Sequence, residues 1–162
     1  MKKSILVFIA SACCSAFAMN ASAQQADQAT TDAVIAMVKS QWASEIKDPT
    51  SITEQMKDAA DDYTELNADY ATRLDGKAMT TRLAEASGKA SGKTIAAEMA
   101  NPKVQVYNGN TAILTYNYVG VIQDKDGKTE PARAKSTRVF VKRGDKWVLV
   151  HANFGADPAP KQ

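Results

Sequence analysis

Cysteine and histidine are scarce in this chain of 162 residues, which contains two cysteines and one histidine. Both cysteines, Cys13 and Cys14, lie within residues 1–23, a segment with the properties of a removable leader. The rest of the chain therefore has no thiol for a disulfide, a nucleophile or a thiolate metal site. A single histidine also excludes a metal site built from several histidines. We expect neither a metal nor another cofactor.

Net charge is also absent once this leader is set aside. Lys2 and Lys3 account for the formal charge of +2, and the rest of the chain has 18 basic and 18 acidic residues. This balance removes the usual electrostatic basis for binding nucleic acid or an anionic membrane surface. We therefore expect neither as a partner, and the sequence contains no Gly-rich phosphate loop either.

The leader resembles a bacterial signal peptide in its order of residue types. Basic Lys2 and Lys3 precede an apolar stretch, Ile5–Phe17, that is too short to span a bilayer. Small residues at Ala21 and Ala23 then occupy the two positions that a signal peptidase recognises. We therefore predict a signal peptide over 1–23, one domain over 24–156 and a tail over 157–162, with a periplasmic or secreted location.

Exported protein is expected to begin at Gln24, because cleavage after Ala23 fits the small-residue pattern best. An earlier cut after Ala18 and lipidation of Cys13 are the alternatives, although Ala10 stands where a lipidated protein has a larger aliphatic residue. N-terminal sequencing of periplasmic material tests this prediction. An intact Met1 or a lipid on Cys13 would contradict it.

Apolar periodicity predicts helices in the first half of the domain. An apolar residue at every fourth position from Val34 to Ile46 predicts an amphipathic helix of about four turns, with this stripe in the core. Asp48-Pro49 is expected to end it. A capping-box pattern at Ser51–Glu54 predicts a second short helix that continues to Ala60. The third predicted helix, Met79–Ala86, lies between Gly76 and Gly88.

Strand patterns dominate the second half, where two-residue turns such as Asn108-Gly109 predict hairpins. A brief strand at Tyr63–Leu66 precedes them, and the later predicted strands are Thr94–Met99, Val104–Tyr107, Thr111–Gln123, Ala134–Arg143 and Lys146–Phe154. The pattern is typical of an α+β protein with three N-terminal helices packed on one face of a mainly antiparallel sheet.

Three short blocks in the second half resemble a known family. They are Asn101–Val106, Thr137–Arg143 and Lys146–Asn153. In the same order they are similar to blocks of the SnoaL-like, nuclear transport factor 2-like family, most of all its calcium/calmodulin-dependent protein kinase II association-domain branch. Asn153 stands where that branch has a second histidine. The resemblance extends over nearly the whole domain.

This resemblance implies a cone-shaped, cystatin-like fold, in which a curved sheet wraps around a long helix and leaves a pocket. It also implies homodimers that use the outer face of the sheet. The family includes isomerases, cyclases, binding modules and assembly domains, so the fold does not select among these activities.

The strongest candidate site residue is Arg138, because a guanidinium in the middle of an apolar strand needs an anionic partner. That partner is either a ligand carboxylate, which suits the planar fork, or an acid such as Glu98 in a structural ion pair. Alternation places His151 on one strand face with Trp147, Leu149 and Asn153. The predicted ligand-binding residues are Arg138, His151, Asn153, Tyr116, Tyr118 and Trp42.

Catalytic residues are not assigned. The three long C-terminal strands contain no carboxylate facing a pocket, and the remaining candidate bases, Glu65, Asp69, Asp75 and Glu98, are more consistent with solvated charges. We therefore predict an exported homodimer that binds a small, anionic organic ligand. The alternatives are an isomerase or cyclase that acts on a hydrophobic carbonyl compound, and an assembly module with a vestigial pocket.

Overall fold

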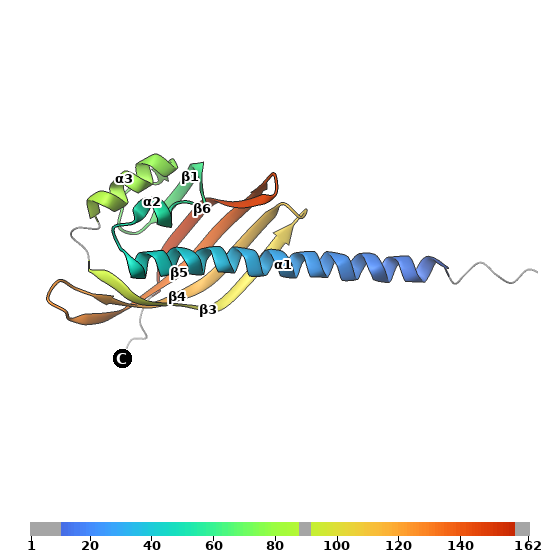
Figure 1. The fold of residues 1–162 in the computed structure, drawn as a ribbon, viewed down its shortest axis with the longest axis horizontal. Helices are drawn as coiled ribbons and strands as arrows, with labels where there is room; N and C mark the ends of the chain where they lie inside the picture. Colours follow the sequence, from blue (N-terminus) through green and yellow to red (C-terminus); the bar gives the residue numbers. More distant parts are fainter. Residues whose placement is uncertain (1–10, 88–91, 158–162) are drawn as a thin grey trace, which may run out of the picture.

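A six-stranded sheet carries a long helix across one face (Figure 1). The computed structural model describes residues 11–87 and 92–157. In chain order the elements are α1 (Ser11–Lys47), α2 (Ile52–Gln55), β1 (Ala59–Asn67), β2 (Leu74–Asp75), α3 (Lys77–Ser87), β3 (Lys93–Tyr107), β4 (Thr111–Gln123), β5 (Thr129–Arg143) and β6 (Lys146–Ala156). The predicted α+β class is confirmed.

The strand order in the sheet is β2-β1-β6-β5-β4-β3. Only β1 and β6 are parallel, and the other neighbouring pairs are antiparallel. Asn108 and Gly109 have left-handed φ angles of 51° and 67°, and they lie in a loop of three residues, not the predicted two, between the paired residues Tyr107 and Thr111. The predicted meander of long strands, β3 to β6, is therefore present.

The buried stripe of α1 consists of Val34, Val38 and Trp42, as predicted. Ile46 is 37% exposed, so its assignment to the core was wrong. A step of four residues rotates the side chain about 40° beyond a full turn, so Ile46 lies about 120° around the helix from Val34. Lys47 ends α1 directly before Asp48-Pro49, as expected.

The N-terminal part of α1 extends beyond the sheet (Figure 1). The helix includes residues 24–30 and also the expected cleavage position after Ala23. Cleavage stays a prediction. Within the described residues, no helix combines the length and apolar composition needed to cross a membrane.

Two details of the helix prediction were wrong. The Ser51 hydroxyl donates to the backbone oxygen of Asp48 at 2.6 Å and accepts no hydrogen bond from the N–H groups at the start of α2, so no capping box forms. The second helix ends at Gln55, because Ala59 and Ala60 begin β1. Only two of the three helices in the described residues are long, and α3 follows two strands, so the expected set of three N-terminal helices is not confirmed. Gly88 lies outside the described residues.

A single strand, β3, replaces the two strands predicted on either side of Asn101-Pro102. The pairing with β4 shifts register between Ala100 and Lys103, and Asn101 has a φ of 51°. This bulge accommodates Pro102, which has no N–H to donate to a neighbouring strand. The strand therefore bends at the proline and continues.

A second irregularity interrupts β6. Val139 pairs with His151, but the next residue, Phe140, pairs with Leu149, so Val150 is an extra residue in the ladder. Leu149 and Ala152 are consequently both buried in the core. The expectation that His151 and Asn153 share a face with Leu149 was wrong, because simple alternation does not continue across a bulge.

Candidate functional site

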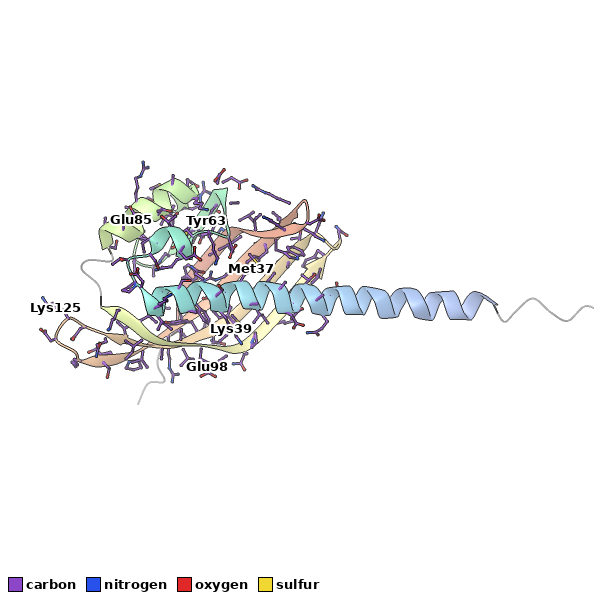
Figure 2. The ribbon with its side chains drawn as sticks, in the orientation of Figure 1. Met37, Lys39, Tyr63, Glu85, Glu98 and Lys125 are labelled. Atoms are coloured by element: carbon purple, nitrogen blue, oxygen red, sulfur yellow. The ribbon has the colours of Figure 1, made fainter. Side chains whose placement is uncertain are left out.

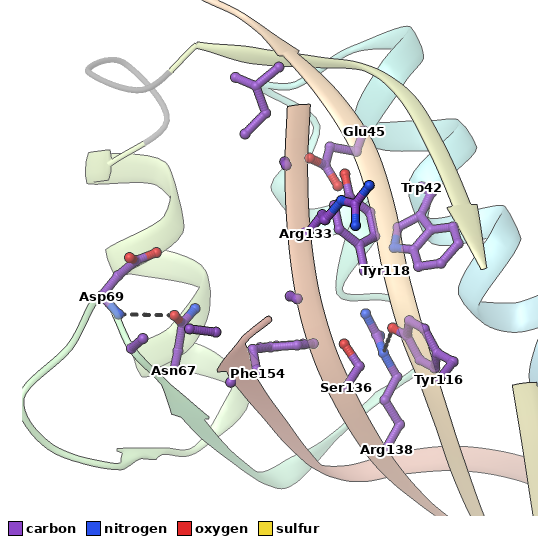
Figure 3. A pocket seen from close by; sticks show the side chains of 16 residues that line it. Trp42, Glu45, Asn67, Asp69, Tyr116, Tyr118, Arg133, Ser136, Arg138 and Phe154 are labelled. Carbon is purple, nitrogen blue, oxygen red and sulfur yellow. Dashed lines mark hydrogen bonds between the residues drawn. The ribbon is translucent and has the colours of Figure 1, made fainter. Parts of the chain in front are cut away.

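A cavity of about 470 Å³ opens between α1 and the inner face of the sheet (Figure 3). Its walls come from α1, β4, β5, β6 and the end of β1. The lining residues are Trp42, Glu45, Asn67, Ala68, Asp69, Tyr116, Tyr118, Ile122, Ala132, Arg133, Ala134, Ser136, Arg138, Phe154, Gly155 and Ala156. This volume is in the range of sites for small organic molecules.

Arg138 forms part of the inner wall, and only 4% of its surface is exposed. Its Nε donates to the Tyr116 hydroxyl at 2.9 Å, and its Nη1 donates to Oε1 of Gln41 at 2.6 Å. The guanidinium carbon lies 5.2 Å from the centre of the Phe154 ring, a cation–π distance. Strands β4 and β6 and helix α1 thus hold the guanidinium from three sides.

All three partners of Arg138 are neutral. The ion pairs found among the described residues do not include it. Its Nη2 makes no hydrogen bond within the described part of the chain. Every fully enclosed side-chain nitrogen or oxygen of the described residues has a hydrogen-bond partner. Nη2 is therefore not fully enclosed, and it belongs to a residue that lines the cavity. A buried cation with a free donor is a site for an anion.

The ion pair with Glu98 that was considered for Arg138 is absent from the described part of the chain. Glu98 is exposed and lines a different groove with Lys39 and Ile46. In Figure 2, Glu98 and Tyr63 lie on opposite sides of α1. The group that α1 offers to Arg138 is the amide of Gln41.

Behind Arg138 lies a second, smaller cavity of about 60 Å³ that contains Glu65. Arg138 and Phe154 line both cavities, so together they form the wall between them. Glu65 is 8% exposed and accepts hydrogen bonds from the Tyr63 hydroxyl at 2.8 Å and from Nδ2 of Asn67 at 3.1 Å. Glu65 is thus enclosed on β1. The expectation from the sequence that it is a solvated charge was wrong.

The other predicted bases lie apart from one another. Asp69 lines the large cavity but is exposed. Asp75 accepts from Arg73 at 2.7 Å in an exposed ion pair. Together with the exposed Glu98, these residues form no pair of carboxylates at one reacting centre.

An aromatic wall faces the cavity from α1 and β4. The Trp42 ring centre lies 5.6 Å from that of Tyr116 and 5.4 Å from that of Tyr118, both in edge-to-face geometry. Gly120 makes this arrangement possible, because a side chain there would meet the Tyr118 ring. The three predicted aromatic residues and Arg138 therefore share one cavity.

His151 and Asn153 do not line this cavity. The β6 bulge places them on the opposite face of the sheet, in register with Val139 and Thr137 of β5. Nδ1 of His151 lies 2.8 Å from the Thr64 hydroxyl in a hydrogen bond between β6 and β1. Both residues belong to the outer face.

Several lining residues were not identified from the sequence. Glu45, three residues after Trp42, lines this cavity, and Gln41, one residue before Trp42, lines the smaller one. Their four-residue spacing places them on one helix face, which was the available signal. Ser136 and Phe154 required the strand register, because the bulge changes the face of Phe154 relative to Trp147. Arg133 gave no signal beyond its charge.

Alkaline pH is expected to destabilise the fold through Tyr63, which is only 2% exposed. Burial, reinforced by the Glu65 carboxylate, raises the pKa of Tyr63 well above its usual range. Below pH 10 the phenol is protonated in both states, but above it only the unfolded chain loses the proton, so stability falls as the pH rises. The loss is about 1.4 kcal/mol per pH unit for one proton.

Denaturation at several pH values between 8 and 11 tests this. Tyr63→Phe should show a shallower decline than the parent above pH 10, and Tyr107→Phe, at an exposed position, should follow the parent. Equal slopes in all three proteins would refute it.

A curved sheet around a long helix, with a cavity between them, defines the nuclear transport factor 2-like, or cystatin-like, class of α+β proteins. The profile of the calcium/calmodulin-dependent protein kinase II association domain matches residues 31–158. The chain belongs to this family, and the resemblance inferred from its three sequence blocks is confirmed. Among curated proteins, none matches the chain.

Solved structures share this fold at low sequence identity. The association domain of the Caenorhabditis elegans kinase has a TM-score of 0.65 and 15% identity, over 80% of this chain and 98% of that one. An NTF2-like protein from Pseudomonas putida has a TM-score of 0.65 and 17% identity, over 80% and 88%. A candidate scytalone dehydratase from Novosphingobium aromaticivorans has a TM-score of 0.70 and 10% identity, over 81% and 86%.

Proposed function

We propose that this protein binds a small organic carboxylate in the cavity between α1 and the sheet, and that it does so outside the cytoplasm after losing residues 1–23. The observation that carries the binding proposal is the state of Arg138. Arg138 lines the cavity, and its buried guanidinium has neutral partners and an Nη2 that is not fully enclosed. A planar cationic fork at the wall of a cavity suits a carboxylate.

Thermal melts of the protein without residues 1–23 test this proposal against a panel of small carboxylic acids. Binding to the folded state raises the melting temperature with ligand concentration. Matched amides of the same acids serve as controls, because they keep the size and lose the charge. A melting temperature that no acid raises would refute carboxylate binding.

An isomerase or cyclase of this fold is the second candidate, because Glu45 and Asp69 line the same cavity as Arg138. Proton transfer would require one of these carboxylates to contact the ligand. Mass spectrometry of each compound that binds, recovered after long incubation, separates the two functions. Recovery of an isomer or a dehydrated product would favour the enzyme.

Self-association is proposed as a homodimer through the outer face of the sheet. At the middle of this face Val139 is in register with Ile113 of β4 and His151 of β6, and apolar side chains there are partly exposed. An apolar sheet face in water favours association. The family includes association domains, and an assembly module alone would not require the open cavity.

Light scattering of the full chain is expected to give about twice its mass of 17.4 kDa. Val139→Glu should give a monomer, because it places a charge at the middle of the proposed interface. Thr53→Glu, at an exposed position of α2 and away from the outer face of the sheet, should remain dimeric. A monomeric parent protein would refute the proposed interface.

A further inference from the structure

Arg138 and Glu45 lie at opposite ends of the cavity. Arg138 lies at one end with Tyr116 and Ser136, and Glu45 lies at the other end with Tyr118 and Arg133 (Figure 3). No ion pair joins any acid and arginine of the lining within the described residues. The site therefore presents a cationic end and an end that contains an unpaired carboxylate.

The Glu45 carboxylate is held in position by one neutral contact. The hydroxyl of Thr94, which is itself buried, donates to Oε1 of Glu45 at 2.6 Å. Oε2 makes no hydrogen bond within the described part of the chain and can accept one from a ligand. Burial, and to a smaller extent the Glu45 carboxylate, raises the pKa of Tyr118, which places this carboxylate close to the aromatic wall.

A carboxylate beside aromatic rings is an arrangement that favours an ammonium group. The acid supplies a charge-assisted hydrogen bond, and the faces of aromatic rings attract a cation. Trp42 and Tyr118 supply such rings next to Glu45, whereas the Phe154 ring already carries the guanidinium of Arg138. The two ends of the cavity thus have partners for opposite charges.

We propose that the ligand is a zwitterion that places its carboxylate on Arg138 and its ammonium group on Glu45. This inference rests on the proposed function, because it takes the carboxylate site at Arg138 as given. The lining as a whole supports it: Arg133 and Arg138 balance Glu45 and Asp69, so a ligand without net charge leaves the cavity neutral. A dianion that occupied both arginines would leave the carboxylates of Glu45 and Asp69 without a compensating charge.

The helix sets the distance between the two charged groups. Gln41, which holds Nη1 of Arg138, and Glu45 are separated by four residues on α1, or about 6 Å along the helix axis. The two charged groups of an α-amino acid are attached to one carbon and do not span this distance. This spacing favours an amino acid in which several carbons separate the ammonium group from the carboxylate.

Calorimetric titration of the protein without residues 1–23 tests the inference with four compounds of matched length: δ-aminovalerate, valerate, glutarate and amylamine. The aminovalerate should bind at least about tenfold more tightly than valerate, the gain expected from one charge-assisted hydrogen bond. Glu45→Gln should abolish this preference and leave the affinity for valerate unchanged. Glu98→Gln, which neutralises an exposed acid that lines a different groove, should keep the preference.

The outcomes separate this inference from the proposed function. Equal binding of valerate and aminovalerate would overturn the zwitterion and leave carboxylate binding at Arg138 intact. Tighter binding of glutarate than of aminovalerate would also overturn it, in favour of a dicarboxylate held by both arginines. If none of the acids binds, both proposals fail. Melting of Glu45→Gln at the parent temperature without ligand would show that the variant is folded.

Discussion

Replacing Arg138 with leucine is expected to remove carboxylate binding while the protein stays folded. The substitution deletes the charge and the Nη2 donor of a residue that lines the cavity, and two charge-assisted hydrogen bonds are worth about 100-fold or more in affinity. Stability should fall by no more than about 2 kcal/mol, because the groups left behind are the Tyr116 hydroxyl and the Gln41 amide, both neutral and close to the cavity.

Urea denaturation and titration with the best-binding acid measure the two effects separately. Arg138→Lys should bind with intermediate affinity, since it keeps the charge but loses the planar fork. Lys135→Leu removes a cation from an exposed position of the same strand, so its binding should match that of the parent. A stability loss of about 3–5 kcal/mol in Arg138→Leu would instead indicate a broken ion pair with a buried acid such as Glu65.

Replacing Phe140 with alanine is expected to have the largest effect on stability. Phe140 is 1% exposed and is paired in the sheet with Ala112 on one side and Leu149 on the other, both buried. Truncation removes a large apolar side chain and leaves a cavity against α1, at a cost of about 3–5 kcal/mol. The binding site should be affected less, because Phe140 lines only the smaller cavity behind Arg138.

Denaturant unfolding of Phe140→Ala measures this loss. Tyr107→Ala, at a residue that is 47% exposed, is the matched control and should change stability by about 0.5 kcal/mol or less. If the two variants lose similar amounts of stability, Phe140 is not part of the core that its burial indicates.

Patterns that depend on neighbouring residues were predictable from the sequence. The Val34, Val38 and Trp42 stripe and the Asn108-Gly109 turn depend on local spacing and backbone preference, and both are present in the structure. The presence of Arg138 in a cavity with three predicted aromatic residues followed from strand parity and from the family resemblance.

The errors arise where distant contacts override local pattern. Ala59 and Ala60 fit a helix, but pairing of β1 with β6 places them in the sheet. The bulge at Val150 is set by pairing with β5 and cannot be recognised in a strand with apolar residues at successive positions. For the same reason His151 was placed on the wrong face, and Gln41 was not recognised as the partner of Arg138.

The position of β3 at the end of the sheet has a consequence for how copies of this protein can meet. Its open side could template further strands and so nucleate fibrils. Pro102 has no N–H to offer an incoming strand, the left-handed Asn101 bends the backbone, and Lys93 and Lys103 carry charge along it. Open-ended polymerisation strand by strand along this edge is therefore discouraged, which leaves the faces of the sheet as the surfaces for the proposed self-association.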